Sequence, residues 1–95
     1  MWTAVHNATI ENGTIRVDGE KRDEILPHIR DLSSDHHITC AESVNEDESI
    51  PIELKAGGVL FFSFNTPHCT RANNTDSSRA GVAYHFLNES YFRER

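Results

Sequence analysis

One small domain with a modest hydrophobic core is the most that 95 residues allow. The formal charge of -6, with nine Lys and Arg scattered among fifteen acids, argues against a nucleic-acid surface, because phosphate binding rests on clustered basic residues. The longest apolar run, residues 59–62, is far too short to span a bilayer, and no charged-then-apolar leader follows Met1, so we expect a cytoplasmic protein with neither a nucleic-acid nor a membrane partner.

The chain is expected to begin with two β-strands. Residues 2–10 are rich in β-formers, and residues 14–17 alternate with Ile15 and Val17 on one side. Glu11-Asn12-Gly13, which lies between these segments, is a turn signal. Together the three features predict a β-hairpin.

A long polar stretch follows at residues 19–49. Pro27 interrupts its one helix-like segment, residues 23–32, and acids crowd residues 42–48 without the oxygen-ligand pattern of a calcium loop. Connections of this length are uncommon inside compact domains and are usually functional lids or poorly ordered segments. We expect a long exposed loop in which the acids, and the pair His36-His37, are solvated.

Strand-like patterns resume after residue 49. Residues 50–55 alternate apolar and polar side chains, residues 56–58 supply a Gly turn, and residues 59–64 form a strongly apolar segment. After a polar loop at residues 71–78, residues 79–86 alternate again. The whole chain is therefore predicted to be all-β.

The last of these strands has two different faces. Because side chains alternate along a strand, one face carries Ala80, Val82, Tyr84 and Phe86, and the other carries Arg79, Gly81, Ala83 and His85. One guanidinium beside two very small residues is a poor pattern for a filled core. We expect room for a ligand beside Arg79, whereas His85 is interpreted as a structural histidine.

Several motifs occur in a fixed order in the second half. They are a Gly turn with an apolar strand (residues 51–62), the step Thr66-Pro67-His68, the pair Asn73-Asn74, and Arg79, eleven residues after His68. This combination resembles the distal part of phytanoyl-CoA dioxygenase family proteins. Trp2-Thr3-Ala4 and residues 11–15 resemble, less sharply, the family's Trp-containing strand and Glu-Asn-Gly turn, so the resemblance covers most of the chain. Beyond that turn the match fails, because Asp-Gly-Glu-Lys stands where family members often have Pro-Gly-Ser-His.

The resemblance implies the C-terminal half of a double-stranded β-helix, a cupin-like jelly roll that holds iron(II) through two histidines and one carboxylate. His68 would be the distal histidine ligand, Arg79 would bind the far carboxylate of 2-oxoglutarate, and Trp2 would pack near that co-substrate. A planar guanidinium suits this role because it pairs bidentately with a carboxylate. The implied activity is that of an oxidoreductase, an iron(II)/2-oxoglutarate-dependent dioxygenase that hydroxylates a small or CoA-linked organic substrate.

The resemblance is incomplete at the metal site. Family proteins take their other two ligands from a His-X-Asp motif upstream of the Trp strand, and neither His-X-Asp nor His-X-Glu occurs in this sequence. Residues 1–95 are therefore expected to be a partial domain that does not hold iron alone, and no catalytic residue is assigned in it. The chain would be a fragment, the product of an internal start, or a degenerate relative.

A second interpretation comes from a different functional class. Half a jelly roll leaves strand edges unpaired, and such edges invite pairing with another chain. The alternative is thus a non-catalytic, cupin-like β-sandwich binding module that self-associates through those edges. Under either interpretation, the two cysteines of the chain, Cys40 and Cys69, are expected to be free thiols.

Overall fold

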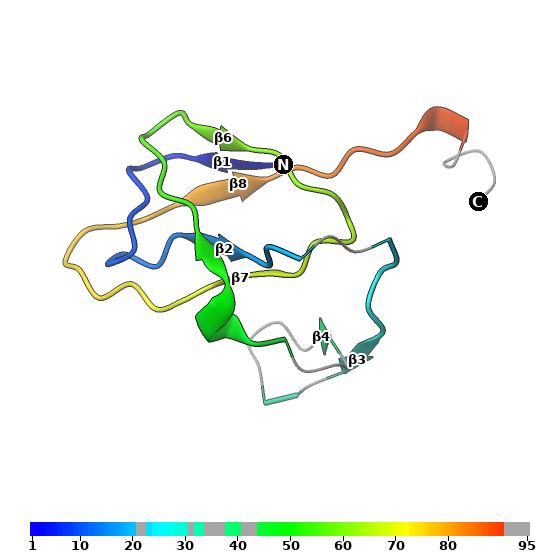
Figure 1. Ribbon diagram of the computed structural model, residues 1–95. Helices are drawn as coiled ribbons and strands as arrows, with labels where there is room; N and C mark the ends of the chain where they lie inside the picture. The colour runs from blue at the N-terminus through cyan, green and yellow to red at the C-terminus, as the bar shows by residue number, and fades with distance from the viewer. Residues whose placement is uncertain (21–22, 31, 34–37, 41–43, 91–95) are drawn as a thin grey trace.

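The computed structural model describes residues 1–20, 23–30, 32–33, 38–40 and 44–90. Its elements in chain order are β1 (Trp2–Ala4), β2 (Ile15–Val17), β3 (His28–Arg30), β4 (Ile38–Cys40), the 3-10 helix η1 (Glu46–Glu48), β5 (Ile50–Pro51), β6 (Val59–Leu60), β7 (His68–Thr70) and β8 (Gly81–Ala83) (Figure 1). Apart from η1 and a helical turn at residues 89–90, the regular structure of the described part is β, which confirms the predicted class. Within that part, no helix is long and apolar enough to cross a bilayer.

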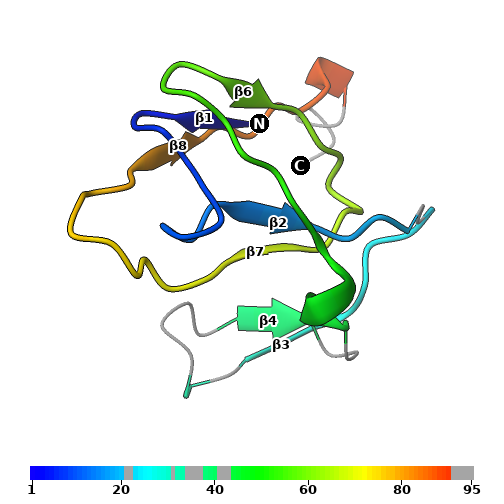
Figure 2. The same ribbon diagram turned by 60° about the vertical axis from the view of Figure 1, so that its left-hand side comes forward.

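Two three-stranded antiparallel sheets form the body of the molecule, with strand orders β6-β1-β8 and β5-β2-β7. In the first sheet, Trp2 lies opposite Leu60 on one side and Ala83 on the other. The chain passes from one sheet to the other at four connections, namely β1 to β2, β5 to β6, β6 to β7, and β7 to β8. The neighbours of each strand in these sheets are therefore mostly distant in sequence (Figure 2).

The predicted hairpin of the first two strands is wrong. β1 pairs with β6 and β8, whereas β2 pairs with β5 and β7. The turn signal itself is real, since Gly13 has a φ of 82°, a conformation that favours glycine. However, residues 5–14 form a loop between the sheets, anchored where Ala8 forms a bridge with Leu54. A turn motif specifies a local bend but not the strands that pair beyond it.

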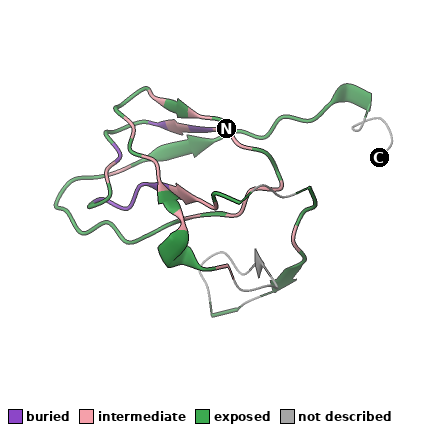
Figure 3. Cartoon of the chain, viewed as in Figure 1, coloured by how far each residue is buried: buried purple, intermediate pink, exposed green. Residues whose placement is uncertain are grey.

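The core lies between the two sheets. Its buried apolar residues come from β1, β2 and their connection, and partly buried ones pack against them: Trp2, Ala4, Ala8 and Ile15, then Ile52, Leu54, Leu60 and Phe62. Because β1 and β2 belong to different sheets, one shared core means that the sheets pack face to face. Figure 3 shows that burial is concentrated along β1, β2 and the loop that joins them. The core is small, as the chain length predicts.

The polar stretch at residues 19–49 contains more structure than a single loop. β3 and β4 pair antiparallel, with Ile29 opposite Thr39. Asn45 caps the N-terminus of η1, since its side chain accepts a hydrogen bond from the backbone of Asp47. Within the helix-like segment, residues 28–30 form a strand immediately after Pro27, which interrupts the helical pattern. Exposure is confirmed for η1, which has no buried residue. The pair His36-His37 lies outside the described residues.

Candidate functional site

His68 is the first residue of β7 and faces the inside of the sandwich. It lies opposite Val17, while Thr70, two residues along the same strand, lies opposite the buried Ile15. Opposed residues and residues two apart share one face of a sheet. The imidazole packs against Phe62 with ring centroids 4.7 Å apart, yet His68 is exposed. An inward-facing side chain that is still exposed marks a place where the sandwich is open.

One hydrogen bond decides which nitrogen of His68 is available. Nδ1 lies 3.1 Å from the backbone oxygen of Thr66. A carbonyl oxygen only accepts, so in the neutral ring Nδ1 carries the hydrogen and Nε2 keeps its lone pair. Metal-ligating histidines are commonly held in this way, with the other ring nitrogen bonded to a backbone carbonyl.

Arg79 lies two residues before β8 and is half-buried. Its Nε donates to the backbone oxygen of Asn12 at 3.3 Å. Within the part of the chain that the structure describes, its terminal nitrogens Nη1 and Nη2 form no hydrogen bond or ion pair. A planar guanidinium held at Nε and unpaired at its outer end presents donors that fit a carboxylate.

The backbone next to Arg79 is fixed from the opposite end of the sequence. The ring nitrogen Nδ1 of His6 accepts a hydrogen bond of 3.0 Å from the backbone of Ala80, and Val5 donates to the carbonyl of the same residue at 3.0 Å. His6 was not predicted to have a role. Its sequence context gives no signal, because its partner is 74 residues away.

Asn12, which holds Arg79 through its carbonyl, is itself locked by its side chain. Its Oδ1 accepts from the backbone of Thr9 and its Nδ2 donates to the carbonyl of Asn7, both at 2.7 Å, and the residue is buried. Sequence reasoning identified the Glu-Asn-Gly turn but not this positioning role. The available signal for this role was the asparagine itself, because an asparagine in a turn often forms side-chain hydrogen bonds with the nearby backbone.

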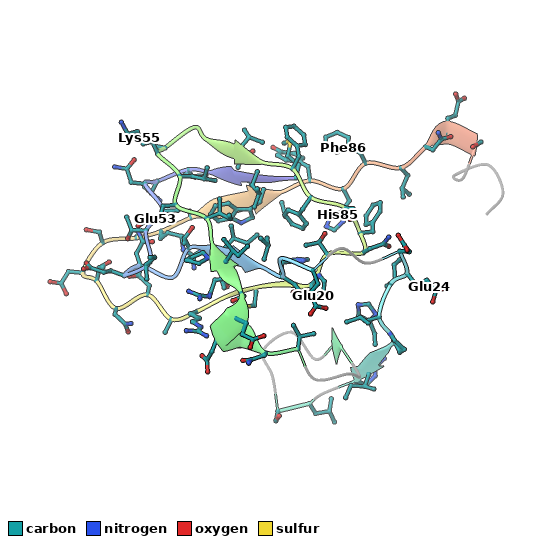
Figure 4. All side chains as sticks on the ribbon, in the orientation of Figure 1. Glu20, Glu24, Glu53, Lys55, His85 and Phe86 are labelled. Atoms are coloured by element: carbon teal, nitrogen blue, oxygen red, sulfur yellow. The ribbon has the colours of Figure 1, made fainter. Side chains whose placement is uncertain are left out.

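Trp2 lies directly over Gly81 on the inner face. A Cβ atom at Gly81 would sit 2.2 Å from Cζ2 of the indole, so the ring occupies the space that a side chain there would take. The expectation of room for a ligand beside Arg79 is not met at Gly81, where the indole fills the space. The alternation that motivated it was correctly assigned, since His85 and Phe86 lie on opposite sides of the segment that follows β8 (Figure 4).

The three candidate residues are distributed over both sheets. Trp2 packs against the strand that Arg79 precedes, in the sheet β6-β1-β8, whereas His68 belongs to the sheet β5-β2-β7. Strands β7 and β8 are each the terminal strand of their sheet and follow one another in the chain. The loop between β7 and β8 therefore joins His68 to Arg79, but the two side chains have different partners. His68 contacts Phe62 and Thr66, whereas Arg79 bonds to Asn12.

The surroundings of two further side chains, those of His85 and Cys69, fit a structural role. The ring of His85 stacks beside Phe64 with centroids 6.1 Å apart, in agreement with a structural histidine. Cys69 is a free thiol, as expected, whereas the side chain of Cys40 lies outside the described part. Burial raises the pKa of the Cys69 thiol, and the charge of Glu46 raises it further, against the opposing effect of Arg71 and a second arginine. This environment disfavours the thiolate that a nucleophile needs.

The family model for phytanoyl-CoA dioxygenase (PhyH) matches residues 1–81. This range includes Trp2, His68 and Arg79 and ends at the first residue of β8. The chain belongs to the phytanoyl-CoA dioxygenase family. No curated protein and no solved structure matches it.

Members of the phytanoyl-CoA dioxygenase family generally depend on iron and 2-oxoglutarate, and the described residues fit these two groups unequally. The guanidinium of Arg79 suits a carboxylate of the 2-oxo acid. In contrast, no group of three or more His, Cys, Asp or Glu side chains among the described residues could hold a metal ion. The free Nε2 of His68 is compatible with a single metal bond, not with a complete iron site.

Proposed function

We propose that this chain is the part of an iron(II)/2-oxoglutarate-dependent dioxygenase that binds the far carboxylate of 2-oxoglutarate and supplies one histidine to the metal. The observation that carries the proposal is the half-buried guanidinium of Arg79, anchored through Nε to Asn12 and unpaired at both terminal nitrogens within the described residues. A carboxylate placed there gains two parallel charge-assisted hydrogen bonds. The orientation of His68, with Nε2 free, supports the second half of the proposal.

The reaction follows from the family assignment rather than from the geometry. Iron(II) with 2-oxoglutarate would supply the oxidising chemistry, and hydroxylation of a small or CoA-linked organic substrate is the proposed outcome. The described residues of this chain would position the co-substrate through Arg79, with the Trp2 indole as the apolar wall nearby. A single histidine does not hold catalytic iron, so no turnover is expected from the chain alone.

For the fold, we propose that β1, β2 and β5 to β8 are six strands of a jelly roll. Two observations support this assignment: two three-stranded antiparallel sheets share one core, and the chain passes from one sheet to the other four times. Such repeated crossing is the connectivity of a double-sheet roll rather than that of a meander. The hairpin β3–β4 is an insertion between two strands of the same sheet.

The co-substrate half of the proposal is tested by ligand titration. Binding of 2-oxoglutarate to the full chain is followed by amide NMR shifts for the wild type, Arg79→Gln and the matched control Arg71→Gln. Arg71 is an exposed arginine that pairs with Asp47 at 3.0 Å. Hydrogen bonds to a charged group contribute about 1.5–3 kcal/mol, so Arg79→Gln should weaken binding roughly 10- to 100-fold. Arg71→Gln should bind as the wild type does.

A comparison of ligands sharpens the same experiment. Pyruvate keeps the 2-oxo acid end of the co-substrate but lacks the far carboxylate, so its binding should not depend on Arg79. Equal losses in both arginine variants, or an equal effect of Arg79→Gln on pyruvate, would refute the assigned role.

The metal half is tested by spectroscopy under anaerobic conditions. Iron(II) and 2-oxoglutarate added to this chain alone are expected to give no visible charge-transfer band. A clear band that disappears in His68→Ala would contradict the conclusion that the site is incomplete.

A non-catalytic β-sandwich binding module is the second candidate. The observation that favours it is the exposure of large apolar residues on the outer face of the sheet β6-β1-β8, such as Phe61 and Tyr84, which are 73% and 51% exposed. In that case 2-oxoglutarate would not bind, and Arg79→Gln would change nothing in the titration.

A further inference from the structure

The carbonyl of Asn12 anchors the guanidinium of the proposed co-substrate site. It accepts the hydrogen bond from Nε of Arg79 at 3.3 Å, although the two residues are 67 positions apart. Nε belongs to the planar guanidinium itself, so this bond restricts the rotation of the whole group. The direction in which Nη1 and Nη2 point therefore depends on how firmly the carbonyl of Asn12 is held.

The other polar groups of Asn12 bond within residues 7–14, which are called the Asn12 turn below. Oδ1 accepts from the backbone of Thr9 and Nδ2 donates to the carbonyl of Asn7, both at 2.7 Å. The backbone N–H of Asn12 donates to Oγ1 of Thr9 at 3.3 Å. Because Asn12 is buried, the loss of any of these bonds would leave a polar group that water replaces poorly.

The Asn12 turn is tied to two distant parts of the chain. The side-chain Oδ1 of Asn7 accepts a hydrogen bond of 2.8 Å from the backbone of Ala56, in the Gly turn before β6. The carbonyl of Glu11 accepts one of 3.0 Å from the backbone of Asn74, in the loop that connects β7 to β8. The turn therefore cannot shift as one body without breaking bonds to both segments.

Gly13 brings the Asn12 turn into contact with the same loop. A Cβ atom at Gly13 would lie 2.1 Å from the carbonyl oxygen of Arg71 and 2.9 Å from that of Ala72, so the two backbones touch with no side chain between them. Glycine allows this approach at a φ of 82°. The turn that holds the guanidinium and the loop that leads to Arg79 therefore form one packed unit.

The anchoring of Arg79 differs from that of two other arginines in the body of the molecule. Arg16 uses Nε and Nη2 together on Ser49, at 2.8 and 3.0 Å, and Arg71 uses Nη2 on the carboxylate of Asp47. Among the described residues, the printed bond of Arg79 is at Nε, and its outer nitrogens have no partner. The side chain is thus held at a point that leaves its carboxylate-binding end available.

We propose that Asn12 is a positioning residue, which orients the guanidinium of Arg79 before 2-oxoglutarate binds and so raises the affinity for the far carboxylate. Arginine has many rotamers, and immobilising such a side chain costs conformational entropy. Where the Asn12 turn already restricts the side chain, ligand binding includes less of that cost. The inference rests on the proposed function and adds to it a residue that is not required to touch the co-substrate.

Thr9→Val tests the inference without changing Asn12 or Arg79. Valine keeps nearly the volume of threonine but removes Oγ1, the acceptor of the Asn12 backbone N–H. The matched control is Thr75→Val, which removes a hydroxyl that bonds to the side chain of Asn73 in the loop between β7 and β8. Both variants lose a threonine hydroxyl from an asparagine-containing turn, but only the first turn holds Arg79.

Two NMR measurements on the full chain report on the anchor and on the ligand separately. The Nε–H signal of Arg79 should exchange with water slowly in the wild type and in Thr75→Val, and several-fold faster in Thr9→Val. In titrations with 2-oxoglutarate, Thr9→Val should weaken binding about 2- to 10-fold, the change that one hydrogen bond of ordinary strength produces. Thr75→Val should bind as the wild type does. Circular dichroism establishes that each variant is folded.

A double-mutant cycle with Arg79→Lys separates positioning from a general loosening of the fold. Lysine keeps a positive charge for the carboxylate but has no Nε that the carbonyl of Asn12 could hold. Thr9→Val should therefore weaken binding in the wild type and have little effect in the Arg79→Lys background. The same loss in both backgrounds overturns the inference, and so does an unchanged exchange of the Arg79 Nε–H in Thr9→Val.

The same experiments distinguish failure of this inference from failure of the proposed function. A wild type that does not bind 2-oxoglutarate, or that binds it equally well as Arg79→Gln, overturns the proposed function and this inference with it. A wild type that binds through Arg79, while Thr9→Val changes neither the exchange nor the affinity, overturns the positioning role of Asn12 alone.

Discussion

Gly81→Ala is expected to destabilise the fold, because the new methyl group would meet the indole of Trp2. The added Cβ would lie 2.2, 2.3 and 2.6 Å from Cζ2, Cε2 and Nε1 of the ring, whereas ordinary contact begins near 3.4 Å. The ring must move by about 1 Å or more, and overpacking of this kind costs about 1–3 kcal/mol. Replacing glycine by alanine returns about 0.4–1 kcal/mol through the unfolded state. The net expected loss is about 1–2 kcal/mol.

Thermal and urea unfolding measure this loss. For a domain of this size 1 kcal/mol corresponds to about 4–8 °C, so the melting temperature should fall by roughly 5–15 °C. Trp2 is the single tryptophan of the chain, and its fluorescence reports on the affected contact directly. The matched control is Gly19→Ala, whose Cβ would meet only the flexible end of Ile50, at 2.9 Å.

A double-mutant cycle separates the steric clash from other effects of alanine. In a Trp2→Leu background the indole is absent, so Gly81→Ala should cost much less than in the wild type. If Gly81→Ala costs the same in both backgrounds, or no more than the Gly19→Ala control, the close approach of the indole to Gly81 is not what limits this position.

Two further predictions concern the turn and the thiol. Gly13→Ala should prevent folding or lower the free energy of unfolding by more than about 3 kcal/mol in chemical denaturation. Its φ is 82°, and the new Cβ would lie 2.1 Å from the carbonyl oxygen of Arg71. The control Gly57→Ala, at a φ of 87° in open space, should lower it by only about 1 kcal/mol. Alkylation of Cys69 by iodoacetamide should have its midpoint at a higher pH than that of an unperturbed cysteine, because burial and then Glu46 raise the thiol pKa. Glu46→Gln removes a negative charge that disfavours the thiolate, so it should lower the pKa and speed the reaction at pH 8; unchanged rates would show that Glu46 has no influence.

Local features of the sequence were predictable because they depend on near neighbours. The alternation of residues 79–86 correctly assigned Gly81 and Ala83 to one face and Val82 to the other, and the Glu-Asn-Gly turn was found where Gly13 adopts its positive φ. These predictions needed only the period of a strand and the conformational range of glycine.

Pairing between distant segments was not predictable in the same way. The hairpin prediction failed because β1 finds its partners at β6 and β8, and the space over Gly81 is filled by Trp2, a residue 79 positions earlier. The contact of His6 with Ala80 has the same character. Without the neighbouring strand in view, two small residues beside Arg79 indicate an empty pocket, although in the folded chain one of them supports an aromatic ring.

The position of β1 between β6 and β8 also has a consequence for how the chain is made. Trp2 and Ala4 are synthesised well before residues 59–60 and 81–83, which form the strands on either side of them. Strand β1 must therefore wait, with its indole unshielded, until β6 and β8 have been synthesised. Because folds dominated by such long-range pairings mature in about milliseconds to seconds, the interval before β8 docks is when the nascent chain is most open to chaperones and to aggregation.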